Sequence, residues 1–276
     1  MLRTAARRAL TLSCVTATAL VAAPAAALAA TQSASAGIVT ATFSYQGSIG
    51  PTISDEMLTI ERSGQVLYSA PVTSTGCTSS TPCDPGSHQA VHVLGLEPGS
   101  EPDIVLDLFT GGANCCTVEQ VFSYDPGTMT YVKSERDFSM AQAKLEPIGA
   151  GGRYEFVSSD ASFQCAFTDC ADSGAPLQIV SFADRRFTKV TSAYPKLIAR
   201  DAAKWLTLYK HHLSDGLGLI APWAADEDLL GRSAQVKSYL AAQVKAHHLK
   251  GQPLFPGGEK FIKALNRLLR KDGYVH

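Results

Sequence analysis

Carboxylates are the residues of this sequence whose types and spacing could do chemistry. Two pairs could supply the acid and base of a hydrolase, Asp103 with Asp107 and Glu155 with Asp160. Strand-rich surfaces carry many such pairs, so spacing alone defines no active site. The nucleophile motif Gly-x-Ser-x-Gly is absent. Asp107 falls in an apolar stretch, where a hydrogen-bonded structural carboxylate is the expected explanation.

Histidines form two adjacent pairs, His211-His212 and His247-His248. Consecutive helical residues point about 100° apart, so neither pair can bind a metal ion by itself. We expect surface histidines near helix ends, where a positive charge is favourable.

Six cysteines follow residue 30 and fall into three local pairs. They are Cys77, Cys83, Cys115, Cys116, Cys165 and Cys170. Proximity favours the bridges Cys77–Cys83 and Cys165–Cys170 with a vicinal bridge between the remaining two. Crossed bridges from the vicinal pair to Cys165 and Cys170 are the alternative. The zinc spacing Cys-x2-Cys is absent, so structural disulfides are predicted.

Two segments resemble the repeats of FG-GAP or VCBS-type secreted proteins. Residues 95–107 read Gly-Leu-Glu-Pro-Gly-Ser-Glu-Pro-Asp-Ile-Val-Leu-Asp, and residues 147–157 look like a second copy. Repeats of this type read Asp-Leu-Asp-Gly-Asp-Gly, then Pro-Glu and a buried strand. Residues 110–116 and 159–163 are similar to segments of secreted actinobacterial proteins of the same type. The resemblance implies a β-domain built from repeats.

The resemblance also implies a calcium loop, here degenerate. Calcium takes six to eight oxygen ligands, several of them carboxylates. In the first copy only Glu97 remains at the three acidic loop positions, and the second copy retains none. Glu97, Glu101 and Asp103 are therefore the metal ligands that the resemblance leaves, for a weak calcium site. No other cofactor is expected.

The elements that would position these residues are strands up to about residue 190. Three hairpins are predicted, at residues 58–68, 121–132 and 179–190, because β-branched and aromatic residues flank short turns. The second and third belong to a unit of about fifty residues in which a strand and a cysteine-bearing loop precede the hairpin. Two or three such blade-like units cannot close a propeller, so a stack of small sheets or a sandwich is expected.

Helical spacing replaces this pattern near residue 194. One helix is predicted at residues 194–213, a second at 226–248 with Asp226 as its N-cap, and a third at 259–271. The fold class is thus α+β, with a β-domain at residues 38–195 and a three-helix segment at 196–276.

Charge divides along the same boundary. Residues 31–195 carry 8 Lys and Arg against 18 Asp and Glu, whereas residues 196–276 carry 13 against 7. The basic helices could bind an anionic cell-wall polymer, or could dock on the acidic β-domain. Nucleic acid is not an expected partner, because basic and aromatic residues are not interleaved.

Residues 1–30 are predicted to be a cleaved signal peptide. Arg3, Arg7 and Arg8 precede an apolar stretch, and Ala27 and Ala29 are spaced for signal peptidase. The arginine pair could also mark export of the folded protein, but cysteines would not pair in the reducing cytosol. Residues 31–37 are expected to be a polar linker, and no later apolar run is long enough to span a membrane.

These features predict a secreted cell-envelope or extracellular protein. The expected role is binding or scaffolding through the repeat-built β-domain, with a wall polymer or another secreted protein as partner. The alternative is a secreted hydrolase whose site lies between the β-domain and the helices.

Overall fold

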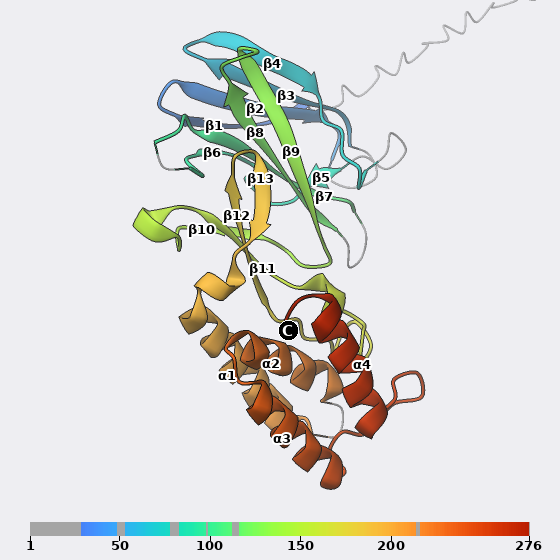
Figure 1. Cartoon of the computed structure of the whole chain (residues 1–276). Coiled ribbons are helices and arrows are strands. Elements are labelled where there is room, and N and C mark those ends of the chain that lie inside the picture. Colours follow the sequence, from blue (N-terminus) through green and yellow to red (C-terminus); the bar gives the residue numbers. More distant parts are fainter. Residues whose placement is uncertain are drawn as a thin grey trace, which may run out of the picture.

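The computed structural model describes residues 29–48, 53–77, 83–97, 99–111, 116–213 and 216–275. The predicted signal peptide lies outside these residues except for Ala29 and Ala30. Three antiparallel sheets precede four helices, so the predicted α+β class is confirmed. In Figure 1 the sheets form one end of the molecule and the helices the other.

The first sheet is a four-stranded meander. It contains β1 (Ala29–Ala36), β2 (Val39–Gln46), β3 (Ser54–Arg62) and β4 (Gln65–Pro71), paired in that order. The pairing of β3 with β4 is the first predicted hairpin.

The linker predicted at residues 31–37 is wrong, because this segment is most of β1. Its Ala, Ser and Thr residues have no apolar alternation, but cross-strand hydroxyl pairs hold it to β2. Ser33 pairs with Thr42 at 3.1 Å, and Ser35 pairs with Thr40 at 2.9 Å.

The second sheet has five strands. They are β5 (Asp84–Pro85), β6 (Val91–Leu94), β7 (Asp103–Phe109), β8 (Thr117–Asp125) and β9 (Thr130–Ser139). Both β5 and β6 pair with the same edge of β7, and β8 with β9 forms the second predicted hairpin.

The third sheet is another four-stranded meander. Its strands are β10 (Lys144–Glu146), β11 (Glu155–Ser159), β12 (Leu177–Ala183) and β13 (Arg186–Lys189). The last two form the third predicted hairpin. In both the second and third sheets a strand precedes a cysteine-bearing loop and then a hairpin.

The second sheet lies between the other two. Alternate residues of β7, such as Ile104 and Leu106, pack against Phe43 and Ile60 of the first sheet. Val105 points the other way and joins a core with residues of the third sheet. Because both faces are covered, β7 is apolar along most of its length, and of its two charged residues Asp103 is buried and Asp107 is partly buried.

Two of the predicted disulfides are present, Cys77–Cys83 and Cys165–Cys170. The crossed alternative is therefore wrong. The predicted vicinal bridge involves Cys115, which lies outside the described residues, and stays a prediction.

The described part of the helical segment contains four helices, so the predicted number of three is wrong. They are α1 (Pro195–His211), α2 (Leu217–Leu229), α3 (Ser233–Lys245) and α4 (Gly258–Lys271). The first and last agree with prediction. In α4, Phe261, Leu265 and Leu269 face the helical core, so its apolar face is already occupied.

The single helix predicted at residues 226–248 is wrong, and Asp226 is not an N-cap. It lies inside α2, which breaks from α3 at Gly231, where φ is +76°. Pro222 makes the start of α2 hard to predict, since proline removes a helical hydrogen bond. The carbonyl oxygen that Pro222 leaves free, on Gly218, instead accepts the backbone N–H of Gly174 at 3.0 Å.

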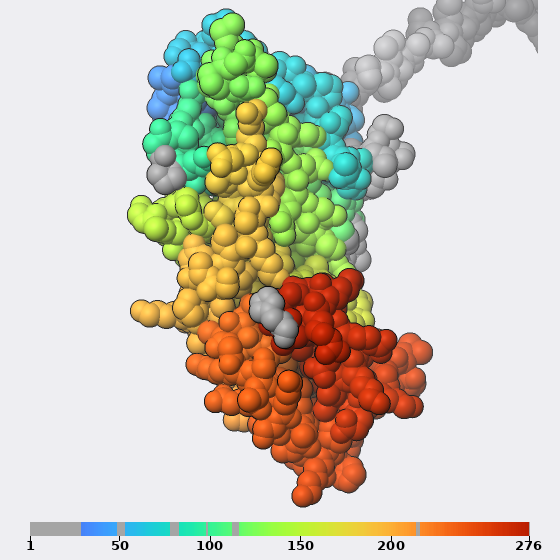
Figure 2. Space-filling model, in the orientation of Figure 1, coloured from blue at the N-terminus to red at the C-terminus, as the bar shows by residue number. Residues whose placement is uncertain are grey.

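The loop between β11 and β12 joins the sheets to the helices. Phe163, Phe167 and Ala175 of this loop belong to the helical core. Near the C-terminus the hydroxyl of Tyr274 donates to Asp160 at 2.8 Å, and Lys189 pairs with the same carboxylate at 3.3 Å. Figure 2 shows the C-terminal segment lying against the sheet end of the molecule.

Candidate binding pocket

A pocket of about 300 Å³ brings together the three predicted metal ligands. Glu97 and Glu101 come from the segment between β6 and β7, and Asp103 is the first residue of β7. The turn of the β12–β13 hairpin adds Asp184 and Arg185. Four carboxylates from two sheets thus line one cavity, which we call the acidic pocket.

Asp103 is the most buried residue of the acidic pocket, with 4% of its surface exposed. The Ser123 hydroxyl donates to Oδ1 at 2.6 Å, and Oδ2 has almost no surface exposed to solvent. Burial raises the pKa of Asp103 to about 6, and Glu97 adds to the increase.

Glu101 is neutralised from outside the pocket. The Arg62 Nε–H lies 2.9 Å from each of its carboxylate oxygens, and the Tyr131 hydroxyl donates to Oε1 at 2.9 Å. Burial, together with this bond, raises the pKa of Tyr131. The Arg62 guanidinium also lies 4.8 Å from the centre of the Tyr124 ring.

The hairpin turn is held in place by its backbone. Asp184 and Arg185 have positive φ angles of 50° and 60°, which side-chain-bearing residues seldom adopt. Glu97 Oε1 accepts the Asp184 N–H at 2.8 Å, and the Ser134 hydroxyl donates to the Arg185 carbonyl oxygen at 2.8 Å. These bonds fix the third sheet against the second at the mouth of the pocket.

Metal binding finds limited support in this geometry. Within the ranges that the structure describes, no three His, Cys, Asp or Glu residues are grouped so that they could hold a metal ion. Glu97 already accepts the backbone N–H of Asp184, and Glu101 already pairs with Arg62. The calcium site at Glu97, Glu101 and Asp103 stays a prediction, although these residues do line one cavity.

Neither carboxylate pair predicted for a hydrolase, Asp103 with Asp107 or Glu155 with Asp160, forms a paired site in the structure. Asp103 and Asp107 lie on one face of β7, but the acidic residue directly across the strand pair from Asp107 is Glu119 on β8. Burial raises the pKa of Asp107 to about 6 and that of Glu119 well above its ordinary value. Glu155 accepts from Arg153 and Tyr194, away from Asp160.

A second carboxyl group is buried where the helices meet the third sheet. Asp226 is fully buried, and neither of its oxygens has a hydrogen-bond partner by distance and angle among the described residues. Burial and the neighbouring Asp201 raise the pKa of Asp226 to about 9. Asp226 is therefore a neutral acid at pH 7.

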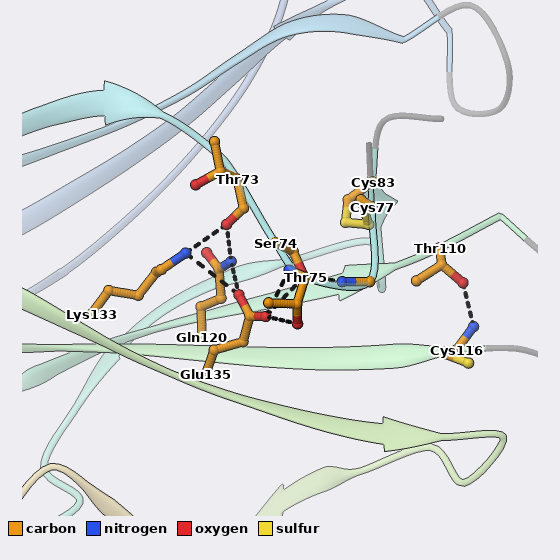
Figure 3. The surroundings of a disulfide bond; sticks show 11 residues. Thr73, Ser74, Thr75, Cys77, Cys83, Thr110, Cys116, Gln120, Lys133 and Glu135 are labelled. Atoms are coloured by element: carbon orange, nitrogen blue, oxygen red, sulfur yellow. Dashed lines mark hydrogen bonds and ion pairs between the residues drawn. A yellow bond between two sulfur atoms is a disulfide. The ribbon is translucent and has the colours of Figure 1, made fainter. Parts of the chain in front are cut away.

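A larger pocket of about 630 Å³ lies beside the Cys77–Cys83 disulfide. Figure 3 shows the polar network next to this bridge: Glu135 accepts from Ser74, from Thr75 and from Gln120. These bonds tie the loop after β4 to the second sheet. Most of the lining surface is apolar, and its two carboxylates are Asp55 and Glu56.

Some residues of the acidic pocket were not predicted. Ser123 reaches the pocket through the pairing of β8 with β7, whereas Asp184 reaches it because the third sheet packs on the second. The one sequence signal for Asp184 is its place in the turn of the predicted hairpin at residues 179–190, next to Arg185 and Arg186. The histidine pairs contribute nothing to this pocket.

Comparison with known proteins gives no function. No family model matches the chain, and no solved structure matches it. A stretch of 142 residues is 27% identical to the uncharacterized protein y4bJ of Sinorhizobium fredii, covering 49% of this chain and 22% of that protein. The chain thus spans about a fifth of that relative's length.

Proposed function

We propose that this protein works outside the cytoplasm as a non-enzymatic binding protein, and that the acidic pocket of its β-domain binds a cationic ligand. A cell-envelope polymer or another secreted protein would carry that ligand group. The observation that supports the proposal is the gathering of four carboxylates, Glu97, Glu101, Asp103 and Asp184, around one cavity.

Two disulfides support the extracellular location. Bridges such as Cys77–Cys83 persist in oxidising compartments. In the described part of the chain, no helix is both long and apolar enough to cross a membrane. Cleavage after Ala29 or Ala30 would leave β1 nearly whole, because the strand begins at Ala29.

The sheet architecture supports a β-domain built from repeats of the FG-GAP or VCBS type. The order of strand, cysteine-bearing loop and hairpin is the same in the second and third sheets. The acidic pocket lies where these two units meet, so packing of one unit on the next would create the binding site.

A thermal-shift assay tests the binding proposal. Wild-type protein and the Asp103→Asn variant are heated with CaCl2 or with 1,5-diaminopentane. We expect at least one cation to raise the Tm of the wild type and to leave that of Asp103→Asn unchanged, because the amide keeps the shape but removes the charge.

Glu146→Gln is the matched control, since Glu146 is exposed on β10 and lies outside the pocket. It should respond as the wild type does. Equal shifts in wild type and Asp103→Asn, or no shift with either cation, would exclude the pocket as a cation site.

The alternative of a secreted hydrolase between the β-domain and the helices has one observation in its favour. Asp226 has a raised pKa, while Asp160, despite its burial, has a lowered one because Ser162, Lys189 and Tyr274 stabilise its charge. Acid–base pairs show such opposite shifts. However, Asp226 is fully buried and Asp160 is 8% exposed, so both favour a structural role at this junction.

A further inference from the structure

We propose that the helical end of this protein binds an anionic lipid membrane, with the loop before α4 inserted and α4 lying on the headgroups. This inference does not rest on the acidic pocket, which lies among the sheets. It follows from a row of basic residues on α4, an apolar residue at the tip of the adjoining loop and the difference in charge between the two ends of the molecule.

The exposed face of α4 is almost entirely basic. We call its five exposed cations the basic stripe; they are Lys260, Lys263, Arg267, Arg270 and Lys271. At 3.6 residues per turn these positions fall within about a third of the circumference of the helix, opposite the buried face. Glu259, in the first turn, is the one acidic residue of α4.

The basic stripe has no acidic partner in the protein itself. Within the described ranges none of its residues forms an ion pair. Docking of the basic helices on the acidic β-domain, which the sequence left open, therefore does not use these cations. A row of such cations along one face is complementary to an anionic surface.

A short loop beside the basic stripe presents an apolar tip. Residues 250–257, which we call the projecting loop, extend from the helices next to α4 (Figure 1). Gln252 and Phe255 exchange backbone hydrogen bonds of 2.8 and 3.0 Å, which places Pro253 and Leu254 at the tip. Leu254 is 86% exposed, more than any other large apolar residue in the described part of the chain.

The neck of the projecting loop is closed by its backbone. The Gly258 N–H donates to the Leu249 carbonyl oxygen at 2.8 Å. Gly251 and Gly257 approach each other so closely that a side chain on either would meet the backbone on the other side of the neck. A loop that is already ordered loses little conformational entropy when its tip is buried.

An apolar tip beside a basic face fits a lipid bilayer. The acyl region can take up the Leu254 side chain, while the exposed Lys250 and Lys260 on either side of the loop reach the headgroup phosphates. A soluble anionic polymer would use the cations and leave Leu254 in water. The exposure of Leu254 therefore favours the membrane. The apolar residues of α4 itself are occupied in the helical core, so the loop and not the helix is the part that inserts.

The distribution of charge would orient the molecule on such a surface. Residues 196–276 carry 13 Lys and Arg against 7 Asp and Glu, whereas residues 31–195 carry 8 against 18. The helices and the sheets form opposite ends of the molecule (Figure 1), so an anionic surface attracts one end and repels the other. The β-domain with its acidic pocket is then held away from the membrane.

Sedimentation with lipid vesicles tests this inference. The secreted form, without the predicted signal peptide, is mixed with vesicles of equal parts phosphatidylglycerol and phosphatidylcholine, or of phosphatidylcholine alone, in about 0.1 M NaCl. We expect binding to the anionic vesicles and little binding to the neutral ones.

One pair of variants tests the projecting loop. Leu254→Ser should weaken binding to the anionic vesicles about 10-fold, because it removes the side chain that inserts. Val66→Ser is the matched control, since Val66 is 53% exposed but lies on β4 at the other end of the molecule. It should bind as the wild type does.

A second pair of variants tests the basic stripe. Lys263→Gln combined with Arg267→Gln should weaken binding about 10-fold or more. Lys144→Gln combined with Arg186→Gln removes the same charge from exposed positions of the third sheet and should leave the affinity unchanged. Equal losses in the two double variants would mean that net charge and not α4 drives binding, and would overturn the inference.

Other outcomes would also overturn it. Equal binding to both kinds of vesicle, or binding to neither, is incompatible with an anionic membrane as the partner. Inorganic polyphosphate provides the soluble polyanion for comparison. If it binds as tightly as the anionic vesicles, and Leu254→Ser binds both as the wild type does, the basic stripe takes an anionic polymer and the membrane inference is wrong.

Discussion

At the scale of single residues, the most unusual groups are two buried carboxyl groups, Asp103 and Asp226, which differ in their surroundings. Asp103 belongs to the wall of the acidic pocket and accepts the Ser123 hydroxyl. Asp226 faces protein on all sides and stays neutral instead. The two residues therefore differ in their surroundings, since Asp103 lies in the wall of a cavity and Asp226 lies inside the helical segment.

Asp226 should make the stability of the protein depend on pH. In the unfolded chain its carboxyl ionises near pH 4, whereas in the folded protein its pKa is about 9. The folded state holds one more proton between these values, so stability should fall as pH rises through this window.

Asp226→Asn should remove this pH dependence, because the amide resembles the neutral acid. Its stability relative to wild type should rise from pH 5 to pH 8 by up to about 1.4 kcal/mol per pH unit. Urea unfolding at four pH values measures this. Asp172→Asn, on the surface, should track the wild type; an Asp226→Asn curve parallel to wild type would contradict the assignment.

At the scale of elements, β1 shows that a strand can lack a strand pattern. Its Gln32 Oε1 accepts the Ala90 N–H at 2.6 Å, and Ala90 is fully buried. Gln32→Ala would leave that donor unpaired and should cost about 1–3 kcal/mol of unfolding free energy.

Ser35→Ala is the control on the same strand, because Ser35 is exposed and pairs only with Thr40. It should change stability by less than about 0.5 kcal/mol. Chemical denaturation of both variants gives the comparison. If Gln32→Ala is as neutral as Ser35→Ala, β1 behaves as the linker that the sequence suggests.

The sequence predicted those elements whose signal is local. The β8–β9 and β12–β13 hairpins were predictable because their strands alternate and their turns are short. The α2 helix was not, since it is apolar on nearly every side and contains Pro222. Glu97, Glu101 and Asp103 could be predicted to lie together because they are close in sequence. Asp184 could not, because only the packing of the third sheet on the second brings it to the pocket.

At the scale of the whole molecule, the junction of sheets and helices depends on Tyr274. Its side chain is 3% exposed, and its hydroxyl donates to Asp160 beside Lys189. Tyr274→Phe keeps the ring and removes this bond, which should lower the free energy of unfolding by about 1–3 kcal/mol.

Tyr239→Phe provides the matched control for thermal unfolding. Its hydroxyl makes no hydrogen bond to any residue within the described ranges, while its ring packs on Trp223 at 4.9 Å. The Tm should fall for Tyr274→Phe and stay nearly unchanged for Tyr239→Phe. Equal Tm values for the two variants would mean that the junction does not depend on this bond.

The proposed binding function depends on the acidic pocket, and NMR of uniformly 15N-labelled protein tests this pocket most directly. Addition of 1,5-diaminopentane should shift the backbone amides of Ser123, Asp184 and Arg185, and Asp103→Asn should abolish these shifts. Shifts confined to the helices α3 and α4, or no shift at millimolar diamine, would contradict the pocket as the binding site.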